Sequence, residues 1–287
     1  TDELRMSTNF RSKVIGVSLK DRGAILPAGH SANAAYWYDK GKFISSTYYM
    51  NALPKWVNDF NANEYPAKTM NGVWNTLLPI DKYSMSTADA KNYEGTIPGI
   101  RTTTFPYRFD TVAASKKTET FRYTPFGATY TLDFAKAAIE YEKMGAGAFS
   151  DFVCISVSST DYAGHSFGPN SIELQDIYLR LDKDLESFLQ YLDAKLGKGN
   201  YLFFLSADHG AAHNVGFMNE HKMPAGSFSE AAFKNEINRM IADSTGFTNA
   251  VLAIENYQVY IELDGLEKSG KDAGRVKQLI MKALRSK

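Results

Sequence analysis

Cysteine, net charge and long apolar runs are what this chain of 287 residues lacks. Its single cysteine, Cys154, has no second cysteine to pair with, so the chain is not a small scaffold held together by internal disulfides. The 32 lysine and arginine residues balance the 32 aspartate and glutamate residues, which argues against a nucleic acid or a membrane surface as the partner. No apolar run is long enough to cross a bilayer.

What the chain has is the composition of a globular protein, with 44% hydrophobic and 22% charged residues. At this length it can bury a sizeable core, and we expect residues 1–287 to form one α/β domain. Cys154 falls inside an apolar run and is interpreted as a small core residue. No internal repeat divides the chain.

Three short apolar runs have the length and composition of buried strands: Lys13–Leu19, Phe152–Val157 and Tyr201–Leu205. Between the last two, Ser171–Lys195 predicts one amphipathic helix, because apolar residues recur there at steps of three and four. Strand, helix and strand then form a parallel crossover, so the segments that follow the two strands meet at the same carboxyl edge of one sheet. Ligands bind at that edge in open α/β sheets.

An aspartate and a histidine follow each of these last two strands. Asp161 and His165 come after the first, and Asp208 and His209 come after the second. Carboxylate oxygens and imidazole nitrogens both suit zinc, and two such pairs could hold two metal ions for an in-line displacement at phosphorus. The alternative is that Asp161 caps a turn and that the histidines are ordinary loop residues. The occurrence of both pairs in one crossover favours metal binding.

Lys20 and Arg22 follow the run Lys13–Leu19 directly. If that strand is parallel to the other two, both side chains reach the edge where the Asp/His pairs lie. An ammonium and a forked guanidinium suit a phosphoryl group whose negative charge is spread over its outer oxygens. The alternative for these residues is a solvated turn. A loop is expected to follow at Ala24–His30. No role is assigned to Asp21.

The remaining segments predict short elements around this sheet. From residue 65 to residue 131, aromatic, threonine and proline residues crowd together without periodicity, and we expect an irregular insertion that forms a cap or lid beside the sheet edge. A hairpin is expected from Ala35–Tyr38 and Phe43–Met50, and an antiparallel pair from Ala250–Glu255 and Gln258–Leu263. Further helices are expected at Pro54–Asn61, Thr131–Met144, Ser229–Ala242 and Ala273–Ser286.

Two stretches carry a resemblance to a known family. Thr160–Pro169 and Ser206–Gly210 resemble the two metal-binding segments of the alkaline phosphatase superfamily, most closely those of its phosphate-irrepressible monoesterase branch. The resemblance extends over nearly the whole chain. It implies an α/β fold with a mostly parallel central sheet and helices on both faces, to which the irregular insertion and the C-terminal antiparallel pair are added.

The same resemblance implies which residues bind metal. Asp161 and His165 would bind one zinc ion, and Asp208 and His209 would bind the other. His213 lies close to Asp208 in the sequence but matches no ligand of the family. We interpret His213 as a histidine that supports the site or the fold by a hydrogen bond.

The resemblance also implies a reaction. Lys20 and Arg22 match a Lys-x-Arg pair that contacts the non-bridging oxygens of the phosphate. The implied activity is the hydrolysis of small-molecule phosphate monoesters at a two-zinc site, through a phosphothreonine intermediate, in a periplasmic or secreted enzyme. A phosphodiesterase or a sulfatase of the same superfamily is the alternative.

The chain departs from the superfamily pattern at both ends. Nothing before Lys13 matches the family's first metal-binding aspartate or its nucleophilic threonine, and no later histidine follows His221. We therefore expect a truncated middle part of a longer enzyme, inactive by itself and a weak zinc binder. A non-catalytic zinc- or phosphate-binding fragment is the alternative from another class of function.

Overall fold

A four-stranded sheet organises residues 1–221 of the computed structural model, which describes residues 1–256 and 258–285. β1 (Val14–Ser18) lies parallel to both of its neighbours, β2 (Ala34–Asp39) and β6 (Phe152–Ser156). The short β3 (Lys42–Ile44) runs antiparallel to β2. Every residue of β1 is buried, as its apolar sequence predicts for a central parallel strand. The mostly parallel sheet and the hairpin are confirmed, although the second hairpin strand ends earlier than expected.

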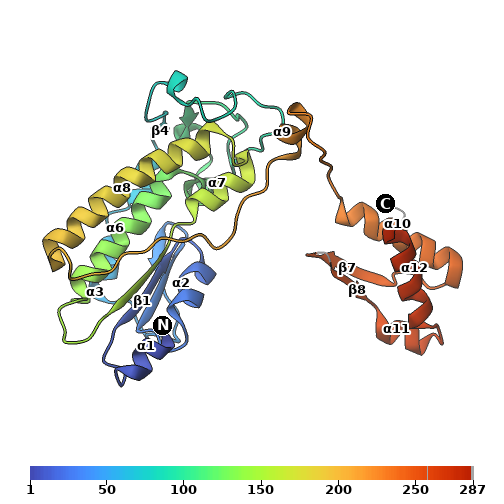
Figure 1. Cartoon of the computed structure of the whole chain (residues 1–287), viewed down its shortest axis with the longest axis horizontal. Helices are drawn as coiled ribbons and strands as arrows, with labels where there is room; N and C mark the ends of the chain where they lie inside the picture. The colour runs from blue at the N-terminus through green and yellow to red at the C-terminus, as the bar shows by residue number, and fades with distance from the viewer. Residues whose placement is uncertain (257, 286–287) are drawn as a thin grey trace. The chain divides into compact units, whose positions relative to one another are not determined.

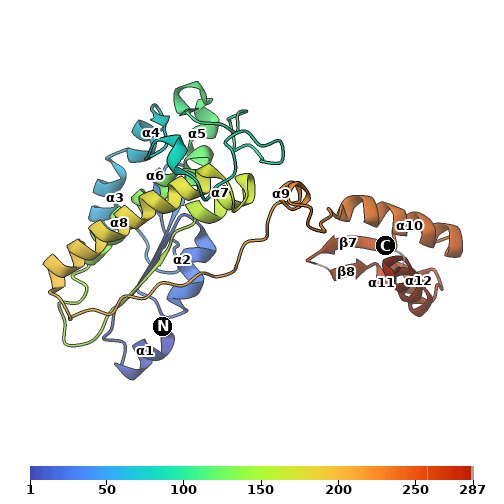
Figure 2. The same cartoon turned by 45° about the horizontal axis from the view of Figure 1, so that its top comes forward.

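Helices cover both faces of this sheet, as Figure 1 and Figure 2 show. α2 (Asp21–Ala28) leads from β1 to β2, and α6 (Pro125–Tyr141) leads into β6. Because β2 and β6 flank β1 on opposite sides, right-handed crossovers place α2 and α6 on opposite faces. α8 (Ile172–Leu196) packs on α6 and forms an outer layer.

The long helix α8 has the limits that its sequence predicts. The Ser171 hydroxyl accepts a hydrogen bond from the backbone N–H of Leu174 at 3.2 Å and so caps the first turn. Gly197 ends the helix with a φ of 88°, which a glycine adopts without steric cost. By contrast, α6 begins before the predicted Thr131, because Pro125 is well suited to the first turn of a helix.

The segment expected to be a loop at Ala24–His30 belongs mostly to helix α2, so that expectation was wrong. Ala24 and Ala28 lie one turn apart and are both buried against the sheet. Gly16 of β1 permits this close packing, since a Cβ atom at Gly16 would lie 2.0 Å from the Ala24 carbonyl oxygen. The helix therefore depends on a glycine in a different element, which its own sequence does not reveal.

The prediction of a strand at Tyr201–Leu205 is also wrong. These residues run extended but belong to no sheet, and the Leu202 side chain is 88% exposed. Among the described residues, β6 is the last strand of the sheet, and four of its five positions are only partly buried. An apolar run becomes a strand only when a neighbour satisfies its backbone groups. Tyr201–Leu205 has no such neighbour in the part of the chain that the structure describes, although the Phe204 ring lies 6.1 Å from that of Phe152.

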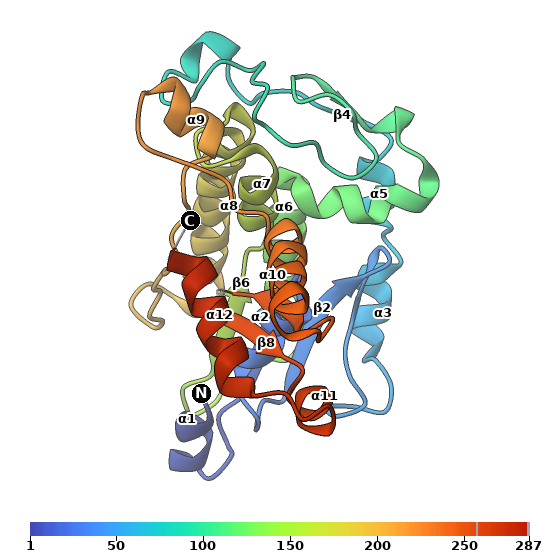
Figure 3. The same cartoon turned by 90° about the vertical axis from the view of Figure 1, so that its right-hand side faces the viewer.

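The stretch from 65 to 131 consists of short pieces that share the main core. Asp176 of α8 anchors it by accepting hydrogen bonds from the indole of Trp74 at 2.7 Å and from the backbone N–H of Leu77 at 2.6 Å. Another hydrogen bond, from the Gly95 N–H to the Ser166 carbonyl at 2.7 Å, ties it to α7 (Ser159–Phe167). Figure 3 shows the backbone of this stretch near α7. A cap or lid role stays a prediction. The pieces are α4 (Tyr65–Thr69), β4 (Val73–Trp74), η1 (Ile80–Lys82), β5 (Tyr107–Arg108), η2 (Phe109–Thr111), α5 (Ala114–Thr120) and η3 (Phe121–Tyr123).

Residues 222–287 form a separate compact unit. Its antiparallel pair is β7 (Val251–Glu255) with β8 (Gln258–Ile261), as predicted, and the residue at 257 between them lies outside the described residues. α10 (Glu230–Thr245) is capped by the Ser229 side chain and pairs with α12 (Ala273–Arg285) over a small apolar core. The predicted end of the last helix at residue 286 also lies outside the described part. α11 is Leu263–Lys268.

The other short helices are α1 (Asp2–Ser7), α3 (Lys55–Asn61) and α9 (Val215–Glu220). The predicted helix at Pro54–Asn61 is confirmed, with Pro54 at its N-cap. No helix among residues 1–256 and 258–285 has the length and apolar content needed to cross a membrane. The structure divides the chain into two compact units, residues 1–221 and 222–287. That residues 1–287 form one domain stays a prediction.

Candidate functional site

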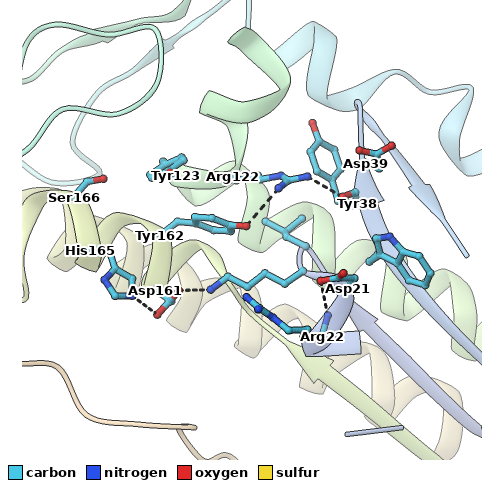
Figure 4. A pocket seen from close by; sticks show the side chains of 13 residues that line it. Asp21, Arg22, Tyr38, Asp39, Arg122, Tyr123, Asp161, Tyr162, His165 and Ser166 are labelled. Atoms are coloured by element: carbon cyan, nitrogen blue, oxygen red, sulfur yellow. Dashed lines mark hydrogen bonds and ion pairs between the residues drawn. The ribbon is translucent and has the colours of Figure 1, made fainter. Parts of the chain in front are cut away.

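A pocket lies at the carboxyl ends of β1 and β2, next to η3 and α7 (Figure 4). Four segments far apart in the sequence contribute to its wall. These are Leu19–Arg22 after β1, Trp37–Asp39 at the end of β2, Arg122 and Tyr123 in η3, and Asp161, Tyr162, His165 and Ser166 in α7. The sheet edge that the sequence predicts as the binding edge is therefore where the pocket lies.

Lys20 and Asp161 meet in this pocket. Lys20 occupies the N-cap of α2, and its Nζ forms an ion pair with Asp161 Oδ2. The Nζ atom also lies 4.7 Å from the centre of the Tyr162 ring, within reach of a cation–π contact. Desolvation acts to raise the pKa of Asp161, but the hydrogen bond from Lys20 and the nearby positive charges hold it below its usual value. Asp161 is thus kept as a carboxylate.

Two histidines approach the other oxygen of the same carboxylate. His165 Nε2 lies 3.3 Å from Asp161 Oδ1, and the two residues stand four positions apart on α7, so their side chains share one helix face. His209 Nε2 lies 3.4 Å from the same oxygen, although it comes from the extended segment that follows Leu205. Three of the four predicted metal residues therefore come together around one carboxylate.

Asp208 is the fourth predicted metal residue and lies at the edge of this group. Its carboxylate Oδ2 is 3.7 Å from His209 Nε2, and its side chain is 89% exposed. The backbone carbonyl of Gly210 accepts from the His209 ring, and that bond, followed by the charge of Asp208, raises the pKa of His209. The sequence predicts that His209 pairs with Asp208, yet its Nε2 lies closer to Asp161.

The donor set fits zinc by its chemistry. Asp161, His165 and His209 offer one carboxylate and two imidazole Nε2 atoms that point at a common oxygen, and zinc takes such donors. Within the described residues, no group of three or more such side chains already stands at positions that would hold a metal ion. Asp161 Oδ2 is occupied by the Lys20 ammonium, so the carboxylate is shared between the predicted metal site and the predicted phosphate site.

Arg22 and Arg122 are the other cations of the pocket. Arg22 stands in the first turn of α2, and its backbone N–H donates to Asp21 Oδ1 at 2.7 Å. Arg122 donates to the backbone carbonyl of Tyr38 at 3.1 Å and to the Tyr162 hydroxyl at 3.4 Å. Among residues 1–256 and 258–285, no carboxylate lies within ion-pair distance of either guanidinium. Two pocket cations are therefore open to an anionic ligand.

Sequence reasoning missed Arg122 and Tyr162 as pocket residues. Arg122 lies in the aromatic stretch from 65 to 131, where no motif or periodicity marks it. Tyr162 stands inside the recognised segment Thr160–Pro169, next to Asp161, so its place in the motif was a usable signal.

The other histidines are held away from Asp161. His213 Nδ1 lies 2.8 Å from Asn170 Oδ1, and its ring stacks on Phe217 at 4.9 Å. His221 Nδ1 lies 2.9 Å from the carbonyl oxygen of Phe217. His30 is exposed beside Asp2. These contacts agree with the interpretation of His213 as a supporting histidine.

Comparisons with known proteins agree on one relationship. The family model described as type I phosphodiesterase / nucleotide pyrophosphatase matches residues 9–282. Alkaline phosphatase PafA of Elizabethkingia meningoseptica is 51% identical over 99% of this chain and 52% of its own length. Alkaline phosphatase PhoV of Synechococcus elongatus is 53% identical over 97% of this chain and 50% of its own length. The chain spans about half the length of these curated relatives.

Solved structures give the same picture. The crystal structure of wild-type PafA superimposes with a TM-score of 0.94 and 50% sequence identity, over 100% of this chain and 55% of that chain. A PafA mutant with four substitutions superimposes with a TM-score of 0.93. Two of its substitutions replace a lysine and an arginine, two positions apart, by alanine.

Proposed function

The chain belongs to the type I phosphodiesterase / nucleotide pyrophosphatase family, within the alkaline phosphatase superfamily, and from this premise we propose that its pocket hydrolyses phosphate monoesters with the help of two zinc ions. Lys20 and Arg22 hold the phosphoryl group in this proposal. The substrate is a small molecule, and the compartment is the periplasm or the exterior of the cell. The similarity to two alkaline phosphatases supports the monoester as the substrate class.

One observation carries the proposal. Lys20, Asp161, His165 and His209 come from three distant segments and meet at one carboxylate on the binding edge of the sheet. A structural ion pair needs only two of these groups, whereas a metal-assisted phosphate site needs cations and metal donors together. The spacing of Lys20 and Arg22 also equals that of the lysine and arginine replaced in the PafA mutant.

The metal ligands follow the predicted pairs. Asp161 and His165 would hold one zinc ion, and Asp208 and His209 would hold the other; zinc would supply Lewis-acid charge at the phosphate. The closeness of His209 to Asp161 supports two neighbouring metal positions. Were Asp161 to hold a metal ion, its carboxylate would no longer be available to Lys20, and the Lys20 ammonium would be left for the phosphate.

Lys20 and Arg22 act on the charge of the phosphoryl group. The guanidinium offers two parallel N–H donors to the outer oxygens, and the ammonium acts as a point charge. Both hold charge that builds up on these oxygens as the bond to the leaving group breaks. The pocket lining contains no threonine. The phosphothreonine intermediate and the inactivity of the chain by itself therefore remain predictions that depend on the resemblance alone.

The family description keeps a phosphodiesterase as the second candidate. A diester has one outer oxygen substituted, so it offers fewer charged oxygens to Lys20 and Arg22. A sulfatase needs a modified cysteine or serine as nucleophile. The only cysteine, Cys154, is 9% exposed, lies within β6 and does not line the pocket, which argues against that role. The third candidate function is that of a non-catalytic zinc- or phosphate-binding fragment.

Rates on three substrates test the proposal. The product of the whole reading frame would be assayed on a phosphate monoester, a phosphate diester and a sulfate ester that share one leaving group. We expect the monoester to react fastest, and added chelator to abolish the rate. A faster diester would favour the second candidate, and no hydrolysis of any ester would favour the non-catalytic one.

A further inference from the structure

The pocket extends past the predicted phosphate position to a second cationic region around Arg122. Figure 4 shows Tyr162 between the Lys20–Asp161 ion pair and the Arg122 guanidinium. On one side, Lys20 Nζ lies 4.7 Å from the centre of the Tyr162 ring. On the other, the Tyr162 hydroxyl accepts from Arg122 at 3.4 Å. Tyr162 therefore separates two positively charged parts of one pocket.

The charge of Arg122 is not neutralised by the protein around it. Its hydrogen bonds go to two neutral oxygens, the Tyr38 carbonyl and the Tyr162 hydroxyl, and its guanidinium lies 5.4 Å from the centre of the Tyr38 ring. Its Nε–H is buried and has no hydrogen-bond partner among the described residues. An arginine has five N–H donors, so several are left for a ligand. Asp39 lines the same pocket but lies outside ion-pair distance of Arg122.

A cation that is partly removed from water needs a counter-charge. In the proposed function, the phosphoryl group supplies the counter-charge of Arg22. Arg122 has no such role there, since it lies on the far side of Tyr162 from Lys20. A substrate with only one anionic group leaves Arg122 without a partner.

We propose that Arg122, with Tyr162, binds a second anionic group on the leaving-group side of the substrate. The preferred substrates are then phosphate monoesters that carry a further phosphate or carboxylate. The inference rests on the proposed function, because it takes Lys20 and Arg22 as the site of the reacting phosphate. Arg122 sets specificity by a bidentate charged contact, the kind of contact that a guanidinium makes best with such groups.

A purely structural role for Arg122 makes a different prediction. As a support, Arg122 only holds η3 on β2 through the Tyr38 carbonyl. Its loss would then disturb the pocket for all anions alike. As a subsite, its loss weakens only ligands that have a second anionic group.

Binding to the chain itself separates these roles. Calorimetry in zinc-containing buffer would compare alkanediol bisphosphates with alkyl monophosphates of the same chain length, over a series of lengths. In the unsubstituted chain we expect a bisphosphate of optimal length to bind about tenfold more tightly than its monophosphate counterpart. Arg122→Gln should remove that preference and leave monophosphate affinity within about twofold. Arg101→Gln, an exposed arginine of the same stretch, is the matched control and should change neither.

Two further variants, Tyr162→Phe and Arg122→Lys, test the subsite even if Arg122→Gln misfolds. Tyr162→Phe should lower the preference partly, and Arg122→Lys should keep part of it. Equal losses for both ligand classes in Arg122→Gln, or no preference at any length in the unsubstituted chain, would overturn the subsite while leaving the proposed function intact. If neither inorganic phosphate nor any monophosphate binds, the proposed phosphate site fails, and the subsite fails with it.

Discussion

The two predicted metal segments look alike in sequence but are held very differently. Asp161 and His165 stand on helix α7, directly after β6, and the Asp161 side chain is 19% exposed. Asp208 and His209 follow an apolar run of similar length, yet that run is an unpaired extended segment and Asp208 is 89% exposed. The difference is that β6 pairs with β1, whereas Tyr201–Leu205 pairs with nothing described. A motif is positioned by the neighbours of its strand more than by its own residues.

Asp161 should therefore matter far more than Asp208. Asp161→Ala removes the carboxylate that Lys20, His165 and His209 share, and we expect it to weaken zinc binding by a hundredfold or more and to lower monoester hydrolysis by about a thousandfold. Asp208→Ala should lower zinc binding and monoester hydrolysis clearly less than Asp161→Ala does. Zinc titration and rates of the whole-reading-frame product would measure both. Equal losses would mean that the exposed segment is as firmly held as the helix.

Arg22→Ala tests the predicted phosphate site beside Asp161. Loss of a charge-stabilising donor should slow monoester hydrolysis by about tenfold to a thousandfold. A diester should lose less, because one of its outer oxygens is already substituted. Exposed Arg101→Ala serves as the control and should leave both rates unchanged. A variant that loses both activities equally would indicate that Arg22 is only structural.

A rise in pH should destabilise the part of the fold around α7 and α8 and leave the unpaired segment at 201–214 nearly unchanged. Burial, followed by the charge of Glu173, raises the pKa of Glu94 to about 8, and burial raises that of Glu173 to about 7. The charge of Asp89 also raises both pKa values, and the charge of Asp176 raises that of Glu173. The charge of Lys91 lowers the pKa of Glu94. Both acids are protonated in the fold at a pH where the unfolded chain is ionised, so folding takes up protons.

This stabilisation is present in full below pH of about 4.5 and is lost as pH rises through about 7 to 8. We expect the free energy of unfolding to fall by several kcal/mol over that range, since one pKa unit corresponds to about 1.4 kcal/mol. Hydrogen exchange should show the loss in α7 and α8, with little change at 201–214. Glu94→Gln, which keeps the side-chain shape, should flatten the pH profile. An unchanged slope in that variant would contradict the assignment.

The smallest effect is expected in the unpaired run. Leu202 is almost fully exposed, so Leu202→Ser should change the free energy of unfolding by no more than about 0.5 kcal/mol. Ile15→Ala, at a fully buried position of β1, should cost about 2–5 kcal/mol by contrast. Chemical denaturation measures both. A large cost at Leu202 would show that the run packs against a neighbour in solution.

The exposed run Tyr201–Leu205 and the edge of β6, which is unpaired among the described residues, also predict self-association. Unpaired strand edges and exposed apolar side chains are both sites of aggregation. Light scattering of the chain should therefore show larger species as concentration rises, and Leu202→Ser with Leu205→Ser should reduce them. A concentration-independent monomer would contradict this.

Local patterns were sufficient to predict several helices and strands. β1 and β6 follow from apolar runs, and α8 follows from its period and from the Ser171 and Gly197 signals at its ends. Asp161 and His165 share a helix face because four positions make one turn. These features need only neighbours within a few residues, so sequence reasoning reached them.

The pairing of strands and the composition of the pocket depend on contacts between segments that are far apart in the sequence. Tyr201–Leu205 has a strand's composition, but pairing is a property of another segment, and no local pattern reports that a partner is missing. His209 approaches Asp161, and Arg122 reaches Tyr162, because the fold brings segments that are far apart in the sequence next to α7. Such convergence depends on contacts across more than a hundred residues for Lys20 and Asp161, and that information lies in the fold rather than in either motif.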